Sequence, residues 1–342
     1  MNLITVSGSA QMDRFIKLPF RLYEDDPRWV PPLISAERKM LDPSRNPFYD
    51  HAEAAHFMVE KDGRLVGRIS AIDNKLHNQV QHQKTGFWGY FECENDPAAA
   101  GALFDAAADW LRKRGLIRML GPVNPSINDP SGLLIEGFEW SPFVLMTYNP
   151  RYYVPLVEKA GFTKAMDLIA YILTHQDLDR ELDIIKDVYN DAWEKNWGFV
   201  PMTDAEVRFQ ADDMKAILLP EFAYIAEIKS RPVGFAFALP DINIVLKRCK
   251  GSLFPFGWWH FLKFNLRKIP TLRLVALGVR KEYHKSGIGT LFYQKVIEEG
   301  LKRNYKAAEC SWILENNDLM NRPIQQMGGK RYKTYRLYEK PI

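Results

Sequence analysis

The alternation of hydrophobic and polar positions along the chain predicts an α/β protein. Segments with a period of two between turn residues predict strands, and segments with a helical period predict helices. The elements expected in the first half are, in chain order, a strand at 3–6, helices within 12–22 and 32–41, a hairpin of 54–59 and 64–72, a strand at 87–93, a helix at 98–114 and a strand at 167–173. This order is typical of an α/β (α+β) sheet of mixed strand direction.

The same order of elements recurs in the second half of the chain. Gly67, in the expected hairpin, returns as Gly234, and Gly161, which follows a predicted helix, returns as Gly328 at the same separation. A weak repeat of this length predicts two copies of one structural module. The second copy carries additional residues before its main helix.

Length and composition fit two globular modules. The chain has 342 residues, of which 46% are hydrophobic and 26% charged, as in ordinary soluble domains. We place the boundary after the strand at 167–173, so that the first module is 1–174 and the second is 175–342. No Gly/Ser-rich linker lies at this boundary, and we therefore expect the modules to pack tightly as a pseudo-dimer.

Charge and hydrophobicity argue against two classes of protein. The net charge of +4 is small and no block of lysines and arginines occurs, so nucleic-acid binding has little support. Residues 1–18 include Asp13 and no long apolar run, which argues against a signal peptide or a membrane anchor. We therefore expect a cytoplasmic protein, with peripheral contact with the inner membrane face left open.

The spacing of cysteines and histidines predicts no metal site. The three cysteines are far apart and odd in number, which is typical of buried thiols in a reducing compartment. Four histidines of the first module lack the spacing that places two zinc ligands on one helical face, and we expect solvated or hydrogen-bonded imidazoles. These residues are Cys93, Cys249 and Cys310, and His51, His56, His77 and His82.

A glycine-containing strand-to-helix loop in the second half predicts an anion site. The segment 273–279 reads as a strand, and the next helix begins near Gly287. Gly287 and Gly289 allow a close approach of the backbone, and the helix dipole places partial positive charge at the loop. Lys281 and Lys285 would reinforce this field.

The loop and its preceding strand resemble the acyl-CoA-binding motif of the GNAT N-acyltransferase superfamily. The resemblance is carried by Leu277-x-Val279 followed by His284-x-x-Gly287-Ile288-Gly289, and by a strand at 307–314, a helix from Asn317 and a strand at 330–338. It implies acetyl-CoA or a longer acyl-CoA as co-substrate. The implied contacts are the backbone of Leu277 and Val279 with pantetheine, the loop of His284, Lys285, Ser286, Gly287, Ile288, Gly289 and Thr290 with pyrophosphate, and Asn317 with the CoA arm.

The chemistry of proton transfer departs from this family pattern. Many relatives place a general-acid tyrosine in the helix before Gly328, where this chain has Pro323-Ile324-Gln325. Tyr332, Tyr335 and Tyr338 are nearby candidates, although all three also suit alternating positions of a terminal strand. Glu315, at the end of the preceding strand, is the candidate base that would deprotonate an amine. Its alternative role is to bind N–H groups at the start of the following helix.

The first module lacks the features of an acyl-CoA site. Its strand at 87–93 leads into Glu92, Glu94 and Asp96 rather than into a Gly-x-Gly loop, and three carboxylates would repel pyrophosphate. We interpret this module as one that has lost CoA binding. The polar loop 124–132 could then face the acceptor cleft.

The additional segment of the second module, 247–268, alternates aromatic and basic side chains, among them Phe254 and Phe264. Residues 254–264 would suit peripheral contact with a membrane, or a wall for a long acyl chain. The alternative is an insertion buried between the modules. The sequence does not decide between them.

The whole chain also resembles a bacterial tandem-GNAT family that includes ceramide synthases, which N-acylate a long-chain amino base. The segments that carry this resemblance are Phe48-x-x-His51-Ala52-Glu53, Gly251-x-Leu253-Phe254-Pro255-Phe256-Gly257, Ser311-Trp312-Ile313-Leu314-Glu315 and Tyr332-Lys333-Thr334-Tyr335. It implies that the acceptor is a small-molecule or lipid amine.

We therefore expect an N-acyltransferase that moves an acyl group from acyl-CoA to a primary amine by direct attack. Cys310 lies within a strand pattern, which disfavours a covalent enzyme intermediate. Two alternatives stay open: a catalytically silent CoA- or lipid-binding sensor, and a transferase that uses aminoacyl-tRNA. The small net charge and the intact loop count against the second. The acceptor, the acyl length and the oligomeric state stay open.

Overall fold

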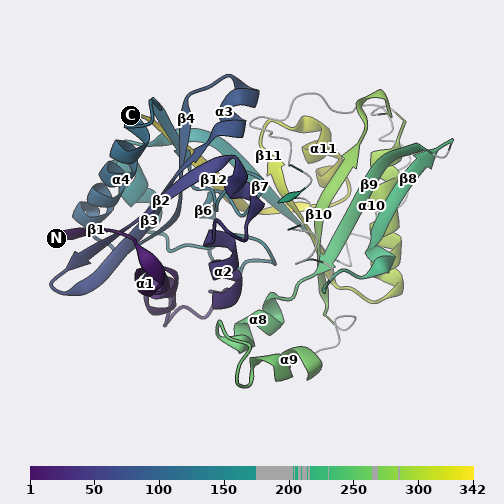
Figure 1. The fold of residues 1–342 in the computed structure, drawn as a ribbon. Helices are drawn as coiled ribbons and strands as arrows, with labels where there is room; N and C mark the ends of the chain where they lie inside the picture. The colour runs from purple at the N-terminus through teal and green to yellow at the C-terminus, as the bar shows by residue number, and fades with distance from the viewer. Residues whose placement is uncertain are drawn as a thin grey trace.

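The computed structural model describes most of the chain. The described residues are 1–174, 203, 205–206, 209, 214, 216–229, 231–263, 269–283 and 286–342. Within them, the strands form one mixed twelve-stranded sheet (Figure 1). The predicted α/β fold with a sheet of mixed direction is confirmed.

The first module follows the predicted order of elements closely. Its elements are β1 (Asn2–Thr5), α1 (Gly8–Leu22), α2 (Ile34–Leu41), β2 (Ala52–Lys61), β3 (Arg64–Asn74), α3 (Lys75–Gln81), β4 (Thr85–Cys93), α4 (Pro97–Arg112), β5 (Arg118–Gly121), β6 (Leu133–Glu136), α5 (Tyr153–Lys159) and β7 (Thr163–Thr174). Alternation identified β2, β3, β4 and β7, because each has one face against a helix. The short helix α3 and the short strand β6 were not anticipated.

The second module repeats this plan with an additional pair of helices. Its described elements are β8 (Ala223–Ile228), β9 (Arg231–Pro240), α8 (Asn243–Cys249), α9 (Gly257–Lys263), β10 (Thr271–Val279), α10 (Ile288–Lys302), β11 (Ala307–Leu314), α11 (Asp318–Gln326) and β12 (Lys330–Pro341). Helices α8 and α9 lie between β9 and β10, and they project below the sheet in Figure 1. Short 3-10 turns lie at Pro47–Asp50, Pro220–Phe222 and Lys281–Tyr283.

The two modules exchange strands at the centre of the sheet. The strand order is β1-β2-β3-β4-β5-β12-β7-β11-β10-β9-β8, with β6 also paired to β12. The last strand of the second module, β12, therefore pairs with β5 of the first, and β7 of the first module pairs with β11 of the second. Strands β12 and β7 pair antiparallel with each other. The modules are thus joined by backbone hydrogen bonds as well as by packing.

Each module keeps a core of its own, and a third core joins them. Helices α4 and α5 pack on the strands of the first module, and α10 and α11 pack on β9, β10 and β11 of the second. The shared core combines first-module residues such as Leu168 with Tyr335 and Leu337 of β12. Arg336 of β12 also pairs with Asp167 of β7, with Nε 2.6 Å from Oδ1. The predicted tight packing of the modules is consistent with this shared core.

All three cysteines are buried free thiols. Burial raises the pKa of Cys93 and of Cys310 to about 12. The unreactive thiols expected from the sequence are confirmed, and a covalent acyl-cysteine at Cys310 is disfavoured because a protonated thiol is a weak nucleophile.

A buried aspartate ties α8 to the first module. Asp241 is 8% exposed, and its Oδ1 accepts hydrogen bonds from the Val144 backbone N–H at 2.9 Å and from the Asn243 N–H at 3.3 Å. The Asn243 side chain donates to the Pro142 carbonyl at 2.7 Å. Burial raises the pKa of Asp241 to about 7. In the folded protein the Asp241 carboxyl therefore stays protonated at a pH where the same carboxyl is ionised in the unfolded chain.

The Asp241→Asn substitution should stabilise the protein more at pH 8 than at pH 5. The raised pKa means that the wild-type protein loses stability as the pH rises from about 4 to 7, by up to about 4 kcal/mol. Asparagine accepts the same two hydrogen bonds without a charge. Thermal unfolding of both proteins at the two pH values measures the difference.

The control for this prediction is Asp109→Asn, whose carboxylate is exposed in α4 and pairs with Arg112. It should change the unfolding temperature little at either pH. An Asp241→Asn effect that is the same at pH 5 and pH 8 would contradict the prediction.

Candidate active site

The parallel strands β10 and β11 separate after a short region of pairing. They pair from Thr271 with Ala307 to Leu274 with Cys310, and beyond that point β10 continues along β9 while β11 continues along β7. The segments 275–279 and 311–314 thus border a wedge in the sheet, where no strand of the described residues pairs with either on the facing side. The two strands are thus splayed next to the predicted anion loop. Leu277 and Val279 lie on the β10 side of the wedge.

The predicted anion loop lies directly after β10. Gly287 is the N-cap residue of α10 with φ 80°, a left-handed conformation that glycine adopts without strain. A Cβ added to Gly289 would meet no atom within 4 Å, so this backbone is open to an approaching group. The first N–H groups of a helix have no acceptor within the helix.

The other predicted loop residues are partly described. The Ser286 hydroxyl donates to the Tyr283 carbonyl at 2.6 Å, which fixes the turn into α10. Ile288 and Thr290 lie in the first turn of that helix. His284 and Lys285 lie outside the described residues.

The equivalent helix start in the first module is occupied by the protein's own carboxylate. Asp96 accepts hydrogen bonds from the N–H groups of Ala98 at 2.9 Å and Ala99 at 3.2 Å, and Pro97 has no N–H to offer. Lys61 donates to the other oxygen of Asp96 at 2.6 Å, and this hydrogen bond lowers the pKa of the carboxyl. A phosphate would have to displace an anion that is already bound. This arrangement supports the prediction that the first module has no CoA site.

The strand wedge of the first module is filled as well. The chain after β5 enters the gap beside β4, where the Val123 N–H donates to Trp88 at 2.9 Å and the Asn124 side chain accepts from the Tyr90 N–H at 2.6 Å. A Cβ on Gly89 would lie 1.6 Å from the Val123 carbonyl oxygen, so glycine is required at this contact. The two wedges therefore differ: one is filled by the chain, and the other has no strand paired across it.

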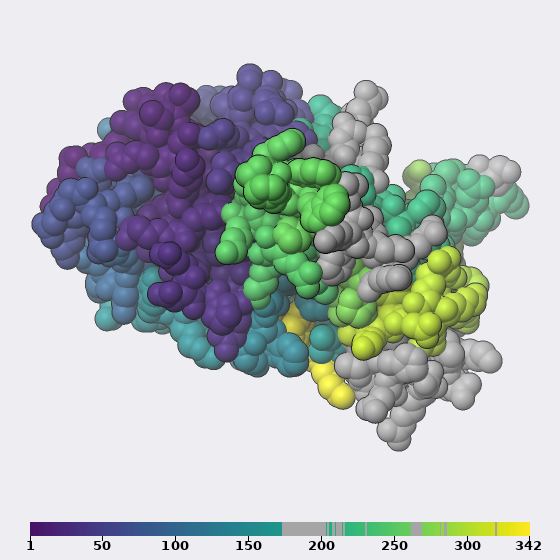
Figure 2. All heavy atoms as spheres, turned by 90° about the horizontal axis from the view of Figure 1, so that it is seen from below, coloured from purple at the N-terminus to yellow at the C-terminus, as the bar shows by residue number. Residues whose placement is uncertain are grey.

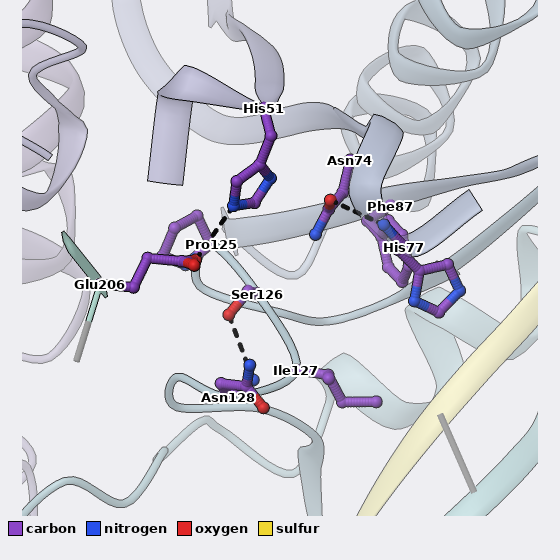
Figure 3. A pocket seen from close by; sticks show the side chains of 9 residues that line it. All are labelled: His51, Asn74, His77, Phe87, Pro125, Ser126, Ile127, Asn128 and Glu206. Atoms are coloured by element: carbon purple, nitrogen blue, oxygen red, sulfur yellow. Dashed lines mark hydrogen bonds and ion pairs between the residues drawn. The ribbon is translucent and has the colours of Figure 1, made fainter. Parts of the chain in front are cut away.

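Part of the polar loop 124–132 lines a small pocket (Figure 3). The pocket has about 10 Å³ of free space, roughly what one water molecule needs. In it, the His51 Nε2 atom lies 3.2 Å from the Glu206 carboxylate. Its lining residues are His51, Asn74, His77, Phe87, Pro125, Ser126, Ile127, Asn128 and Glu206. A pocket of this size does not hold a substrate amine.

Of the other histidines of the first module, His82 is exposed at the end of α3, and His56 and His77 are at least partly buried. The His56 Nδ1 atom lies 2.7 Å from the Ser70 hydroxyl, and burial lowers the pKa of His56 to about 4. Burial also lowers the pKa of His77 to about 4. In the part of the chain that is described, no group of three potential ligands is placed to hold a metal ion.

Glu315, the predicted base, bridges β11 to β7. Its carboxylate accepts from the Lys164 ammonium at 2.5 Å and from the Asp167 backbone N–H at 3.0 Å. The carboxylate thus binds β7 rather than the start of α11. Asn317 has that second role, because its side chain accepts from the Met320 N–H at 3.3 Å and caps α11.

The predicted tyrosines differ in environment. Tyr335 is completely buried in the shared core, and its O–H has no partner among the described residues. Tyr332 is half-buried, and its O–H donates to the carboxylate of Glu309. Burial and this carboxylate raise the pKa of Tyr332, so the phenol stays protonated at neutral pH. Tyr332 therefore combines partial exposure with an acidic partner.

A buried group of charged side chains at the apex of the wedge was not anticipated from the sequence. Arg273 and Glu309 are 3% and 0% exposed, and Nε of the arginine lies 3.7 Å from Oε2 of the glutamate. Arg273 also donates to the Val144 carbonyl at 2.6 Å, and Lys333 donates to the Ser141 carbonyl at 2.8 Å. Burial raises the pKa of Glu309 and lowers that of Lys333 to about 8. We call Arg273, Glu309, Tyr332 and Lys333 the apex cluster.

The apex cluster lies on the face of the sheet away from α10. Leu272, Leu274 and Cys310 pack in the core that α10 covers, so the alternating residues Arg273 and Glu309 point to the other face. The only sequence signal for the cluster was an acidic residue within the apolar alternation of 307–314. The partners of Glu309, Arg273 and Tyr332, come from β10 and β12, and the sequence does not show that these strands meet there.

Comparisons with known proteins agree with this geometry. A model of the acetyltransferase (GNAT) family matches residues 182–324. The bacterial ceramide synthase of Caulobacter vibrioides is 36% identical over 375 aligned residues, which cover 100% of this chain and 98% of that protein. The chain belongs to the GNAT acyltransferase family. Protein YghO of Escherichia coli is also 36% identical, with 99% of this chain and 95% of that protein covered.

Solved structures show that this GNAT protein has the tandem fold. The tandem GNAT protein from the clavulanic acid biosynthesis pathway superposes with a TM-score of 0.57 at 13% identity, covering 99% of this chain and 98% of that one. A GCN5-related N-acetyltransferase from Sphaerobacter thermophilus gives a TM-score of 0.50 at 13% identity, with 99% and 95% covered. The predicted family and tandem architecture are confirmed, and the protein is an acyl-CoA-dependent acyltransferase.

The substitution Gly289→Val should weaken acyl-CoA binding by at least about tenfold, because its side chain would occupy open space beside the N–H groups at the start of α10. An added Cβ at this position meets no atom of the described residues within 4 Å, so we expect the fold to persist. Calorimetric titration with acetyl-CoA measures the affinity, and circular dichroism monitors the fold.

The matched control is Gly101→Val in α4 of the first module, where an added Cβ also meets no atom within 4 Å. This variant should bind acetyl-CoA like the wild-type protein. Equal affinity of the Gly289→Val and Gly101→Val variants would show that the loop does not bind the cofactor.

Proposed function

We propose that this acyltransferase N-acylates a primary amine carried by a long-chain lipid, with acyl-CoA bound by the second module alone. The observation that carries the proposal is the contrast between the two modules. Among the described residues, the second has no strand paired across its wedge and a glycine without a capping side chain at its helix start, whereas the first has both positions filled by its own chain. The full-length identity of 36% to a bacterial ceramide synthase supports a lipid amine as the acceptor.

The proposed placement of acyl-CoA follows the wedge. The backbone of Leu277 and Val279 on β10 would pair with pantetheine and polarise the thioester carbonyl. The N–H groups of residues 285–290, with His284 at the rim, would bind pyrophosphate. This placement brings the thioester toward the apex, where β10 and β11 separate. The apex cluster lies at that point.

The chemistry requires a proton to leave the amine and another to reach the thiolate. The amine nitrogen attacks the thioester carbon, the C–S bond breaks and CoA leaves as the thiol once its sulfur is protonated. Tyr332, held by Glu309, supplies a phenol that stays protonated at neutral pH, and it is our candidate for the acid. Glu315 is the weaker candidate for the base, because Lys164 and a backbone N–H already bind its carboxylate.

A substrate assay tests the function directly. The protein is mixed with acyl-CoAs of increasing chain length and either a long-chain amino alcohol or a short soluble amine, and free thiol and amide product are measured. We expect amine-dependent thiol release with the long-chain acceptor. CoA binding without thiol release for every amine would instead favour a binding sensor, which the absence of a tyrosine in α11 motivates.

The Tyr332→Phe variant should lower kcat by about a hundredfold and change the KM for acyl-CoA little, because it removes a proton donor and leaves the wedge intact. Steady-state kinetics with the acyl-CoA and the amine that are active in the substrate assay gives both kcat and KM. Tyr338→Phe is the matched control on the same strand, since its O–H contacts Glu158 at 3.3 Å and does not reach the apex cluster.

The Glu315→Gln variant tests which of the two candidate residues, Tyr332 or Glu315, contributes more to kcat. If Tyr332 carries the chemistry, this variant should keep most of the wild-type kcat. A near-normal Tyr332→Phe enzyme together with an inactive Glu315→Gln enzyme would reverse the assignment and leave Glu315 as the base.

A further inference from the structure

The α8–α9 segment, residues 243–263, exposes a group of large aromatic side chains. Phe254 is 79% exposed, Phe256 77%, Trp258 41% and Trp259 48%. Single exposed apolar residues are common on protein surfaces, but four aromatic rings within six residues form a contiguous apolar patch. These four rings are not buried between the modules, and Phe264 lies outside the described residues. Figure 2 shows α8 and α9, in green, at the surface facing the viewer.

The charged side chains of the α8–α9 segment itself all have one sign. No aspartate or glutamate occurs from Asn243 to Lys263. Lys247, Arg248 and Lys250 are exposed on the same segment. Among the described residues, no carboxylate pairs with Lys247 or Lys250. An apolar centre beside uncompensated positive charge is complementary to a surface of anionic lipid headgroups over hydrocarbon.

The turn that presents the aromatic rings is held by its own hydrogen bonds. The Trp258 backbone N–H donates to the Leu253 carbonyl at 2.8 Å, and its indole N–H donates to the Pro255 carbonyl at 2.8 Å. The Ser252 hydroxyl donates to the Phe254 carbonyl at 2.7 Å. If the Trp258 ring enters lipid, its indole N–H therefore keeps its hydrogen-bond partner. This removes a large part of the free-energy cost of insertion.

The base of the segment is anchored to the first module. The Ile34 N–H of α2 donates to the Gly251 carbonyl at 3.0 Å. Gly251 has φ 83°, and a Cβ there would lie 2.2 Å from the Phe20 ring, so the close contact requires glycine. Residues of α8 also pack with Val144 and with Val275, which borders the wedge. The aromatic patch is thus fixed relative to the candidate active site.

We propose that the α8–α9 turn docks this protein on the surface of an anionic phospholipid bilayer. Phe254 and Phe256 enter the upper hydrocarbon region, Trp258 and Trp259 lie at headgroup level, and Lys247 and Lys250 contact lipid phosphates. Among the described residues, no helix is long and apolar enough to cross a membrane, so this contact is peripheral. The purpose of docking rests on the proposed function, because a long-chain amine resides in a bilayer, but the docking itself does not depend on activity.

Sedimentation with vesicles tests the docking. The full chain is mixed with vesicles of pure phosphatidylcholine or of equal parts phosphatidylcholine and phosphatidylglycerol, at low and high salt. The wild-type protein should sediment with the anionic vesicles, and less of it at high salt. The Phe254→Ser/Phe256→Ser variant should bind at least about tenfold more weakly. The Lys247→Glu/Lys250→Glu variant should lose at least about fivefold per lysine on anionic vesicles only.

The matched control removes two exposed apolar side chains elsewhere. Ile117 is 62% exposed in the first module and Ile225 is 70% exposed on β8. The Ile117→Ser/Ile225→Ser variant should bind vesicles like the wild-type protein. Circular dichroism and acetyl-CoA titration check that every variant folds, and transfer to a short soluble amine without vesicles should be unchanged in the Phe254→Ser/Phe256→Ser variant.

Three outcomes would overturn the docking. They are wild-type protein that stays in solution with both vesicle types, an equal loss of binding in the control variant, and a wild-type dimer that the Phe254→Ser/Phe256→Ser variant converts to a monomer without any vesicle binding. The last would assign the aromatic patch to contact between two copies of the chain. Vesicle binding by a protein without transferase activity would refute the proposed function and leave the docking intact.

Discussion

The antiparallel pairing of β7 with β12 at the centre of the sheet is the interaction on which the rest of the structure depends. Each of these strands is the last of its own module, and each lies beside the splayed strand of the other. Because β7 pairs with β11, the first module holds one side of the wedge in the second. The carboxylate of Glu315 adds to this contact by binding Lys164 and the backbone of β7. The geometry of the wedge in the second module is therefore set partly by the first module.

The two modules share one framework but differ at the start of the helix and in the gap between the strands. In both, a pair of parallel strands separates and a helix begins after the first of them. In the first module, Asp96 caps that helix and residues near Val123 and Asn124 fill the gap, so the framework has become an internal support. In the second, Gly287 and Gly289 leave the helix start open. Small changes at equivalent positions thus decide whether the site is a ligand site or part of the core.

The sequence predicted where the strands and helices lie along the chain. It did not predict which strands lie next to each other in the sheet. Alternation identified β10, β11 and β12 because each has an apolar face, and Asn317 marked the start of α11 as the residue that caps it. Alternation does not say which strand lies beside which, so the exchange of β7 and β12 was not foreseen. Glu309 was missed for the same reason, since Arg273 and Tyr332 come from other strands. The exposure of Phe254 and Phe256 could not be read from composition, because a packed turn and a surface turn use the same residues.

The exchange of strands also limits how this duplicated protein could change. A chain that lost its first half would lose β7, and β11 would then present an unpaired edge next to the wedge. A chain that lost its second half would expose β5 in the same way. Even if the first module binds no cofactor, as we propose, the fold of the second still requires its strands. Each half of the duplicated chain therefore depends on a strand from the other half. Later mutation cannot easily reverse that dependence.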